Sequence, residues 1–194
     1  RGASTGGHAG SDDAVVVLDN TMIDAGSGAV AIHGSGAGVT SGVILGFSDI
    51  DAGPGGVLID GRSVDANGLY AYGSDIVANG GDISLSGIGG TGGVPFGGGL
   101  YSYGGDIVVH GEGGSGDGVD FSGAVDSAGG DVTMYGYSAD ATGLAFGGSY
   151  YSVIASGGGG ITLTGIGAIV GVMLDGSVSS GSVSAAIDSG GGEI

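Results

Sequence analysis

The aspartates of this sequence recur at fixed intervals, and their spacing suggests chemistry more directly than that of any other residue type. Asp82, Asp106 and Asp131 each precede a pair of alternating apolar residues and lie 24 and 25 positions apart. If the chain folds into stacked repeats of that length, these like charges are neighbours, which predicts raised pKa values or bound cations. Asp117 and Asp120 are two further candidate ligands, because their segment, GGSGDGVDF, is similar to the calcium-binding glycine–aspartate nonapeptide. Two interpretations stay open: structural Ca²⁺ at acidic corners, or solvent-facing carboxylates that accept backbone N–H groups.

Other acidic residues are predicted to extend this pattern. Glu193 is expected in the same column as Asp82, directly before an apolar pair. A second column is expected just after the middle apolar residue of the repeat, and it comprises Asp24, Asp51, Asp126 and Asp188. The acidity is then partly a consequence of the many corners, because the short aspartate side chain bonds readily to nearby backbone.

Catalysis finds little support in the sequence. His8, His33 and His110 show no metal-ligand spacing and are expected on the surface, with His33 and His110 at the same position of two repeats. Arg1 and Arg62 are the only side chains that could act as the basic residue of a polysaccharide lyase. Carboxylate pairs at the separation that glycoside hydrolases need will arise by chance among so many aspartates. The sequence therefore predicts a protein without enzymatic activity and without a cofactor other than Ca²⁺.

Tyrosines gather in the middle of the chain and are the candidate contact surface. The predicted contact residues are Tyr70, Tyr72, Tyr101, Tyr103, Tyr150 and Tyr151. Where tyrosines alternate with apolar positions some must point outward, and an exposed aromatic stripe can stack on sugar rings or contact a protein. Partly buried packing at the rim of the fold is the alternative interpretation.

The elements that position these side chains come from a repeat of about 26 residues. The first apolar triplet of each copy begins at Val16, Val43, Leu69, Val94, Val119, Leu144 and Val172, which are 27, 26, 25, 25, 25 and 28 positions apart. A second apolar pair follows in step: Val30/Ile32, Val57/Ile59, Ile83/Leu85, Ile107/Val109, Val132/Met134 and Ile161/Leu163, with Ile194 expected to begin one more. A fixed period of this size indicates a solenoid, in which each repeat buries its apolar face against its neighbours.

The predicted fold is all-β: a right-handed parallel β-helix of about seven coils with three short strands in each. The segments alternate between apolar and small or polar residues, which is the strand pattern, and they are too short for hairpins. The predicted core ladder contains Val43, Leu69, Val94, Val119, Leu144 and Val172, and a second column with Phe96, Phe121 and Phe146. We expect one domain over residues 1–194, with a glycine-rich corner at 1–14, seven coils at 15–194 and an extension in the seventh coil.

Composition narrows the choice of partners. The chain has 53 glycines, no cysteine and a formal net charge of −18 at pH 7. So negative a surface repels nucleic acids and anionic membranes, and no apolar run is long enough to span a bilayer. The apolar residues fall in columns, which favours an ordered repeat over the disorder that so much glycine first suggests.

The segments IASGGGGITLTGIG (154–167) and GVMLDGSVSS resemble the repeats of large secreted bacterial adhesins. These are the filamentous-haemagglutinin-like exoproteins of two-partner secretion and similar glycine-rich autotransporter passengers. The resemblance covers Val15 to Ile194 and lies in the style of the repeats, so no functional residue is carried over from it. It implies a right-handed parallel β-helix, export to the bacterial cell surface, and a role in adhesion, aggregation or biofilm. The amino-terminal secretion domain of that family is not visible in the sequence.

The expected function is that of an extracellular structural or adhesive rod, with a cell-surface glycan or protein receptor as partner. The first alternative is a filament subunit that assembles with itself head to tail or laterally, because Ile194 is expected to stop where a strand should continue. The second alternative is a carbohydrate-binding or carbohydrate-active β-helix.

Overall fold

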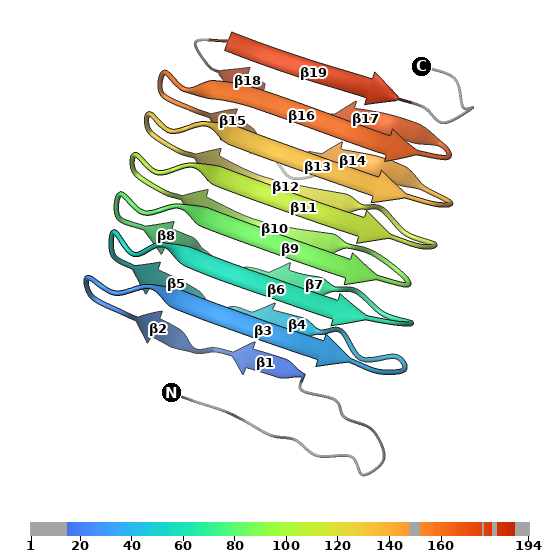
Figure 1. Cartoon of the computed structure of the whole chain (residues 1–194), viewed down its shortest axis with the longest axis horizontal. Helices are drawn as coiled ribbons and strands as arrows, with labels where there is room; N and C mark the ends of the chain where they lie inside the picture. The colour runs from blue at the N-terminus through green and yellow to red at the C-terminus, as the bar shows by residue number, and fades with distance from the viewer. Residues whose placement is uncertain (1–14, 148–151, 176, 180–181, 189–194) are drawn as a thin grey trace.

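The chain folds into a parallel β-solenoid. The computed structural model describes residues 15–147, 152–175, 177–179 and 182–188. These residues form nineteen strands and no helix, and the strands pair in parallel within a seven-stranded and a 12-stranded sheet (Figure 1). The expected all-β parallel solenoid is therefore confirmed. Because no helix occurs in these ranges, none is present there that could cross a membrane.

Each coil passes through three strand positions, and coils are numbered here from one to seven along the chain. The first position holds β1 (Val16–Asp19), β4 (Val43–Gly46), β7 (Leu69–Tyr72), β10 (Val94–Tyr101), β12 (Val119–Asp126), β14 (Thr142–Phe146) and β17 (Val170–Leu174). The second holds β2 (Met22–Asp24), β5 (Asp49–Ala52), β8 (Ile76–Ala78), β15 (Val153–Ala155) and β18 (Ser177–Ser179). The third holds β3 (Val30–Gly36), β6 (Val57–Ser63), β9 (Ile83–Gly89), β11 (Ile107–Gly113), β13 (Val132–Ser138), β16 (Gly160–Gly167) and β19 (Ser182–Asp188).

The first and second positions together make the 12-stranded sheet. In coils four and five, β10 and β12 continue through both positions as single eight-residue strands, so these two coils have two strands where three were expected. Gly98 and Gly123 lie at the junction with positive φ of 153° and 144°, which glycine adopts readily, whereas coils one to three bend there. The third position makes the seven-stranded sheet, which faces the viewer in Figure 1.

The winding is right-handed, as expected. In Figure 1 the strands of the nearer sheet run from left to right, those behind run back, and the chain climbs from β1 to β19. A crossover between parallel strands of L-amino acids favours this hand.

The core is a set of in-register ladders between the two sheets. Val43, Leu69, Val94, Val119 and Leu144 are buried, and Val172 is partly buried at the same register position of coil seven. Phe96, Phe121 and Phe146 form the second column. Their rings stack with centroids 4.9 and 5.7 Å apart and nearly parallel planes, an arrangement that adds about 0.5–1.5 kcal/mol per pair beyond the burial of area.

Glycine columns close the edge at which the third strand of one coil leads into the first strand of the next. The third-strand glycines are Gly34, Gly61, Gly87, Gly111, Gly136 and Gly165. A Cβ on any of them would overlap the carbonyl oxygen of the facing glycine, as Gly136 does with Gly143. The two sheets meet here backbone to backbone, so glycine is required by space rather than by conformational freedom.

The seventh coil corrects the sequence alignment. Val178 of β18 pairs with Ile154, and Val183 of β19 pairs with Ile161. The last described strand of the third position therefore begins at Ser182, and the expectations that Ile194 opens it and that this coil carries an extension were wrong. Asp188 was also misplaced, because it pairs with Ile166 in the third-strand sheet and not with the middle-strand aspartates.

The alignment error arose because coil seven lacks the glycine that the third strand carries in the other coils. Ile187 occupies the position that glycine holds in the other coils, where it pairs with Gly165. An alignment based on apolar residues and glycines therefore took the GGG at residues 190–192 as the corner before the third strand of this coil. Glu193, which was assigned to the aspartate column on that basis, lies outside the described residues, and the position is held by Gly160 in coil six and Ser182 in coil seven.

Candidate contact surface

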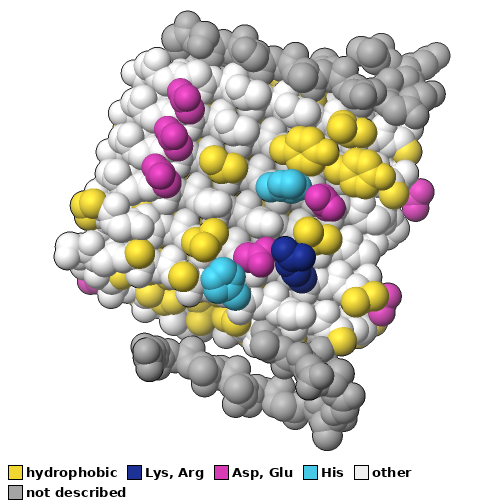
Figure 2. Space-filling view, in the orientation of Figure 1, with side chains coloured by type: hydrophobic (Ala, Val, Ile, Leu, Met, Phe, Trp, Pro, Cys, Tyr) yellow, Lys and Arg dark blue, Asp and Glu magenta, His cyan; other side chains and the backbone are white. Residues whose placement is uncertain are grey.

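The solenoid has two broad outward surfaces that differ in charge. We call the outward side of the seven-stranded sheet the near face (Figure 2) and that of the 12-stranded sheet the far face. Among the described residues, the strands of the near face carry the acidic side chains of Asp60 and Glu112, and the aspartate column of Asp82, Asp106 and Asp131 stands at the edge of this face. The near face also carries all three described side chains that can be cationic, His33, Arg62 and His110. The far face carries Asp19, Asp24, Asp49, Asp51, Asp75, Asp120, Asp126 and Asp175, and no Lys, Arg or His among the described residues.

An exposed aromatic cluster lies on the far face in coils two and three. The Phe47 ring meets the Tyr72 ring edge to face at 5.1 Å between centroids, and Tyr70 lies 5.5 Å from Tyr72. Phe47 is 61% exposed and the two tyrosines are more than a third exposed. A Cβ at Gly46 would meet Tyr72, and one at Gly73 would meet the Phe47 ring, so both rings lie over glycine backbone.

A second aromatic pair lies on the far face in coil four. The rings of Tyr101 and Tyr103 stack with centroids 6.3 Å apart, and Tyr103 is 55% exposed. Tyr101 lies over Gly99, whose Cβ would overlap its ring. Burial raises the pKa of the Tyr101 hydroxyl, and the nearby charges of Asp75 and Asp126 raise it further. The second pair therefore stands within the electrostatic reach of the far-face carboxylates.

Phe47 and Tyr103 occupy turn positions that their side chains do not favour. Phe47 has φ of 46°, in the left-handed region. The equivalent residues of the neighbouring coils are Asn20 with φ of 47° and Gly73 with φ of 60°, both of types that tolerate this conformation. A bulky residue costs about 1–2 kcal/mol there. The turn can thus form without an aromatic residue, yet coil two has Phe47 there with its ring largely exposed to solvent.

Tyr103 shows the same feature at the other end of the middle strand. Its φ is 53°, while the equivalent Ala128 and Gly157 of the next two coils have φ of 51° and 65°. In each of these coils the preceding serine donates to a carbonyl three residues ahead, as Ser102 does to Gly105 and Ser127 to Gly130. The corner is held by this serine, so the aromatic side chain is not needed for it.

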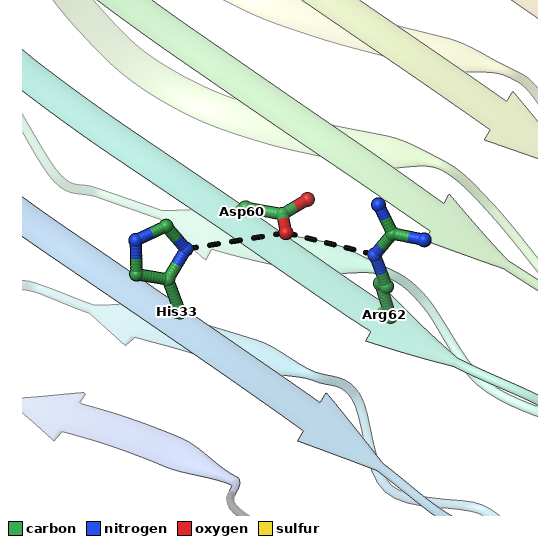
Figure 3. A network of polar contacts seen from close by, with 3 residues as sticks. All are labelled: His33, Asp60 and Arg62. Carbon is green, nitrogen blue, oxygen red and sulfur yellow. Dashed lines mark ion pairs between the residues drawn. The ribbon is translucent and has the colours of Figure 1, made fainter.

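The near face contains a network of three side chains on two adjacent strands. Asp60 Oδ2 lies 3.5 Å from Arg62 Nε on the same strand and 4.0 Å from His33 Nδ1 on the strand before (Figure 3). The three form an open line across β3 and β6, and His33 and Arg62 are largely exposed. Exposed pairs of this kind contribute at most about 1 kcal/mol.

A second near-face pair follows two coils later. His110 Nε2 lies 3.1 Å from Glu112 Oε1, and the His110 ring meets the Tyr135 ring at 4.9 Å. In register, His33, Asp60, Ser86 and His110 form one outward column. The column brings a serine between two histidines, but among the described residues the Ser86 hydroxyl has no hydrogen bond to either imidazole, so the column is not a nucleophile–base pair.

The corner aspartates bond to backbone in the next coil. Asp82 Oδ1 accepts the N–H of Asp106 at 2.9 Å, Asp106 Oδ1 accepts that of Asp131 at 2.8 Å, and Asp131 Oδ1 accepts that of Gly160 at 2.7 Å. Asp117 Oδ1 likewise accepts the N–H of Thr142 at 3.0 Å. Each carboxylate therefore satisfies a corner N–H that the strand ladder does not use.

Calcium stays a prediction for these corners. In the described ranges, no three residues of the types His, Cys, Asp and Glu gather closely enough to hold a metal ion. Asp120, an exposed residue of coil five, has its pKa raised by the desolvation of its carboxyl group and by the charge of Asp117. Asp117 lies three positions before Asp120 in the same coil, so this charge effect acts within a coil and not along the acidic columns.

Sequence reasoning placed some contact residues and missed others. Tyr70, Tyr72, Tyr101 and Tyr103 share the far face, as two separate pairs, whereas Tyr150 and Tyr151 lie outside the described residues. Phe47 was missed, although its position next to the apolar triplet, where the other copies have Asn20 and Gly73, marks it. The His33–Asp60–Arg62 network was missed too, although the repeat alignment puts His33 and Asp60 at one position.

Comparison with known proteins does not assign a function to the chain. No family model, no curated protein and no solved structure matches the chain.

Proposed function

We propose that the chain is a rigid structural and adhesive module of a bacterial cell-surface or extracellular protein. Its far face is the contact surface, and the rest of the solenoid holds that face away from the cell. This assignment follows the resemblance to secreted repeat adhesins and gives the chain no catalytic role. The single observation that carries it is the pair of exposed aromatic residues, Phe47 and Tyr103, kept at left-handed turn positions that neighbouring coils fill with Asn, Ala or Gly.

The two exposed aromatic residues cost the fold stability. An aromatic ring at positive φ is destabilising, and a ring more than half exposed recovers little of that cost through burial. Backbone strain of this kind is commonly found at ligand-contacting positions. Two such residues on one face of an otherwise regular scaffold therefore favour recognition over scaffold packing.

The experiment is an attachment assay with a matched variant. Beads coated with the purified chain are compared with beads carrying Phe47→Asn/Tyr103→Ala, in which each turn has the residue that another coil uses there. We expect wild-type beads to attach to cell surfaces or biofilm matrix and the variant to lose most of this attachment. Equal attachment of both bead types would remove the far face from the proposal.

A second candidate function is a self-assembling filament subunit. Among the described strands, β3 and β19 each pair with another described strand on one side only, and a further parallel strand on the other side would continue the sheet. Electron microscopy separates the candidates. Long fibres with an axial repeat of roughly 34 Å, the height of seven coils at the usual strand spacing, support head-to-tail assembly, and isolated short rods count against it.

A further inference from the structure

The far face combines exposed aromatic rings with carboxylates, and the two together indicate which kind of partner it binds. The aromatic pairs Phe47/Tyr72 and Tyr101/Tyr103 flank the middle strands, and the aspartates of β5 and the turn before β8 lie between them. Along the chain direction the order is aromatic, acidic, aromatic. Phenyl and phenol rings attract cations through their faces, and the attraction grows where carboxylates supply a second, formal charge.

The charge of the face excludes most other occupants. It carries eight aspartates, with no cationic side chain among its described residues, so an anionic polymer is repelled. A second copy of the chain is a poor match, because the whole sequence holds only two Lys and Arg residues and cannot offer a basic segment. The complementary partner is therefore a different molecule that carries several positive charges.

We infer that the far face binds an arginine-rich segment of a partner protein, with guanidinium groups stacked on the Phe47/Tyr72 and Tyr101/Tyr103 pairs and bonded to the aspartates between them. This inference rests on the proposed function and names the partner class of the same surface. Arginine fits better than lysine because its planar guanidinium stacks on rings and bonds carboxylates with two parallel hydrogen bonds.

The geometry of the middle strands fits an extended segment. Asp49 and Asp75 are successive members of one outward column, and each is fixed by a bond to the next coil: Asp49 Oδ1 accepts the N–H of Asp75 at 3.1 Å, and Asp75 Oδ1 accepts that of Gly99 at 2.7 Å. Their carboxylates are thus preorganised, which lowers the cost of binding. Tyr72 pairs in register with Gly97, and Tyr101 lies four residues further along β10. By strand rise and strand spacing the two aromatic pairs are therefore about 14 Å apart, a span that a hexapeptide covers when extended.

The test uses peptides as probes and isothermal titration calorimetry as the readout. Hexa-arginine, hexa-lysine and hexa-citrulline are titrated into the chain at physiological salt. We expect hexa-arginine to bind more tightly than hexa-lysine, because only the former can both stack and pair, and hexa-citrulline, which keeps the planar group without the charge, not to bind. Absence of hexa-arginine binding to the wild type would overturn the inference.

Three variants distinguish a specific binding site from general attraction between opposite charges. Phe47→Asn/Tyr103→Ala changes no charge and is expected to weaken hexa-arginine binding at least tenfold. Asp49→Asn, which keeps the Oδ1 acceptor, is expected to weaken it, while Glu112→Gln removes the same charge from the near face and is expected to have little effect. Circular dichroism and melting curves establish that each variant is folded. Equal affinities of the wild type and the Phe47→Asn/Tyr103→Ala variant would show that charge alone is at work and overturn the inference.

A glycan partner gives a different pattern. If a neutral hexasaccharide such as cellohexaose binds and loses its affinity in Phe47→Asn/Tyr103→Ala, while hexa-arginine does not, the partner is a sugar and the arginine assignment is wrong. The bead assay keeps the two proposals apart. Attachment that depends on Phe47 and Tyr103 but is not competed by hexa-arginine would leave the adhesive function standing and remove only the partner.

Discussion

The near and far faces are built from the same repeat but differ in how their charges are arranged. On the strands of the near face, Asp60 lies beside Arg62 and Glu112 lies beside His110. On the far face Asp24, Asp49, Asp75 and Asp126 accept backbone N–H groups, and aromatic rings stand among these carboxylates. The difference teaches that one regular repeat can pair acidic with cationic side chains on the strands of one face and, among the described residues, place acidic side chains without cationic ones on the opposite face.

The largest expected effect concerns the glycine edge that joins the two faces. Gly136→Ala places a Cβ against the carbonyl of Gly143, in backbone that cannot move without separating the sheets. We expect a loss of more than about 3 kcal/mol in the free energy of unfolding, measured by chemical denaturation. The control is Gly97→Ala on the far face, where the nearest atom is 3.5 Å from the added Cβ. If both variants unfold at the same denaturant concentration, the two sheets are not closely packed at the glycine edge.

The corner aspartates give the next largest effect. Asp106→Ala removes the acceptor of the Asp131 N–H and is expected to cost about 1 kcal/mol, whereas Asp106→Asn keeps the acceptor oxygen and should cost less. The calcium hypothesis predicts instead that added Ca²⁺ raises the melting temperature of the wild type and that Asp106→Asn abolishes this rise. Melting curves in EDTA and in CaCl₂ therefore distinguish a backbone acceptor from a metal ligand.

Asp120 provides a pH-dependent test of the acidic far face. Its pKa is raised in the folded chain, so the folded state binds this proton more tightly than the unfolded state does. The ionised carboxylate therefore destabilises the fold at neutral pH, and this penalty is relieved as the pH falls through the raised pKa towards the ordinary value of 3.8. Asp120→Asn should melt at a slightly higher temperature than the wild type at pH 7, with a smaller difference near pH 4. A constant difference at both pH values would contradict this assignment.

The smallest effect is expected from the near-face network. Arg62→Ala leaves Asp60 exposed beside His33 and should change the free energy of unfolding by less than about 0.5 kcal/mol, because the three groups are solvated. It should also leave hexa-arginine binding to the far face unchanged. A destabilisation of 2 kcal/mol or more, or a change in peptide affinity, would show that the two faces are not independent.

Much of the architecture could be predicted because the same apolar pattern recurs in every copy of the repeat. Val43, Leu69 and Val94 recur at nearly equal spacing, and apolar residues that recur in this way have one economical solution, a stack of coils. The register failed only in coil seven, where Ile187 stands in place of the usual glycine and one copy offers no redundancy. The fusion of two strands in β10 was also missed, since the positive-φ conformation of Gly98 depends on its neighbours in adjacent coils.

The sequence by itself determined the period, the identity of the core ladders and the need for glycine at the corners. Alternation decides which side chains point inward, and burial of apolar surface then decides that the copies stack. Only the tertiary structure decided what stands beside what on the outside. His33 meets Asp60, and Phe47 covers Gly73, through the pairing of residues about 26 positions apart. Outward residues are free of the packing that constrains the core, so their neighbours and turn conformations are fixed only when the coils are in register.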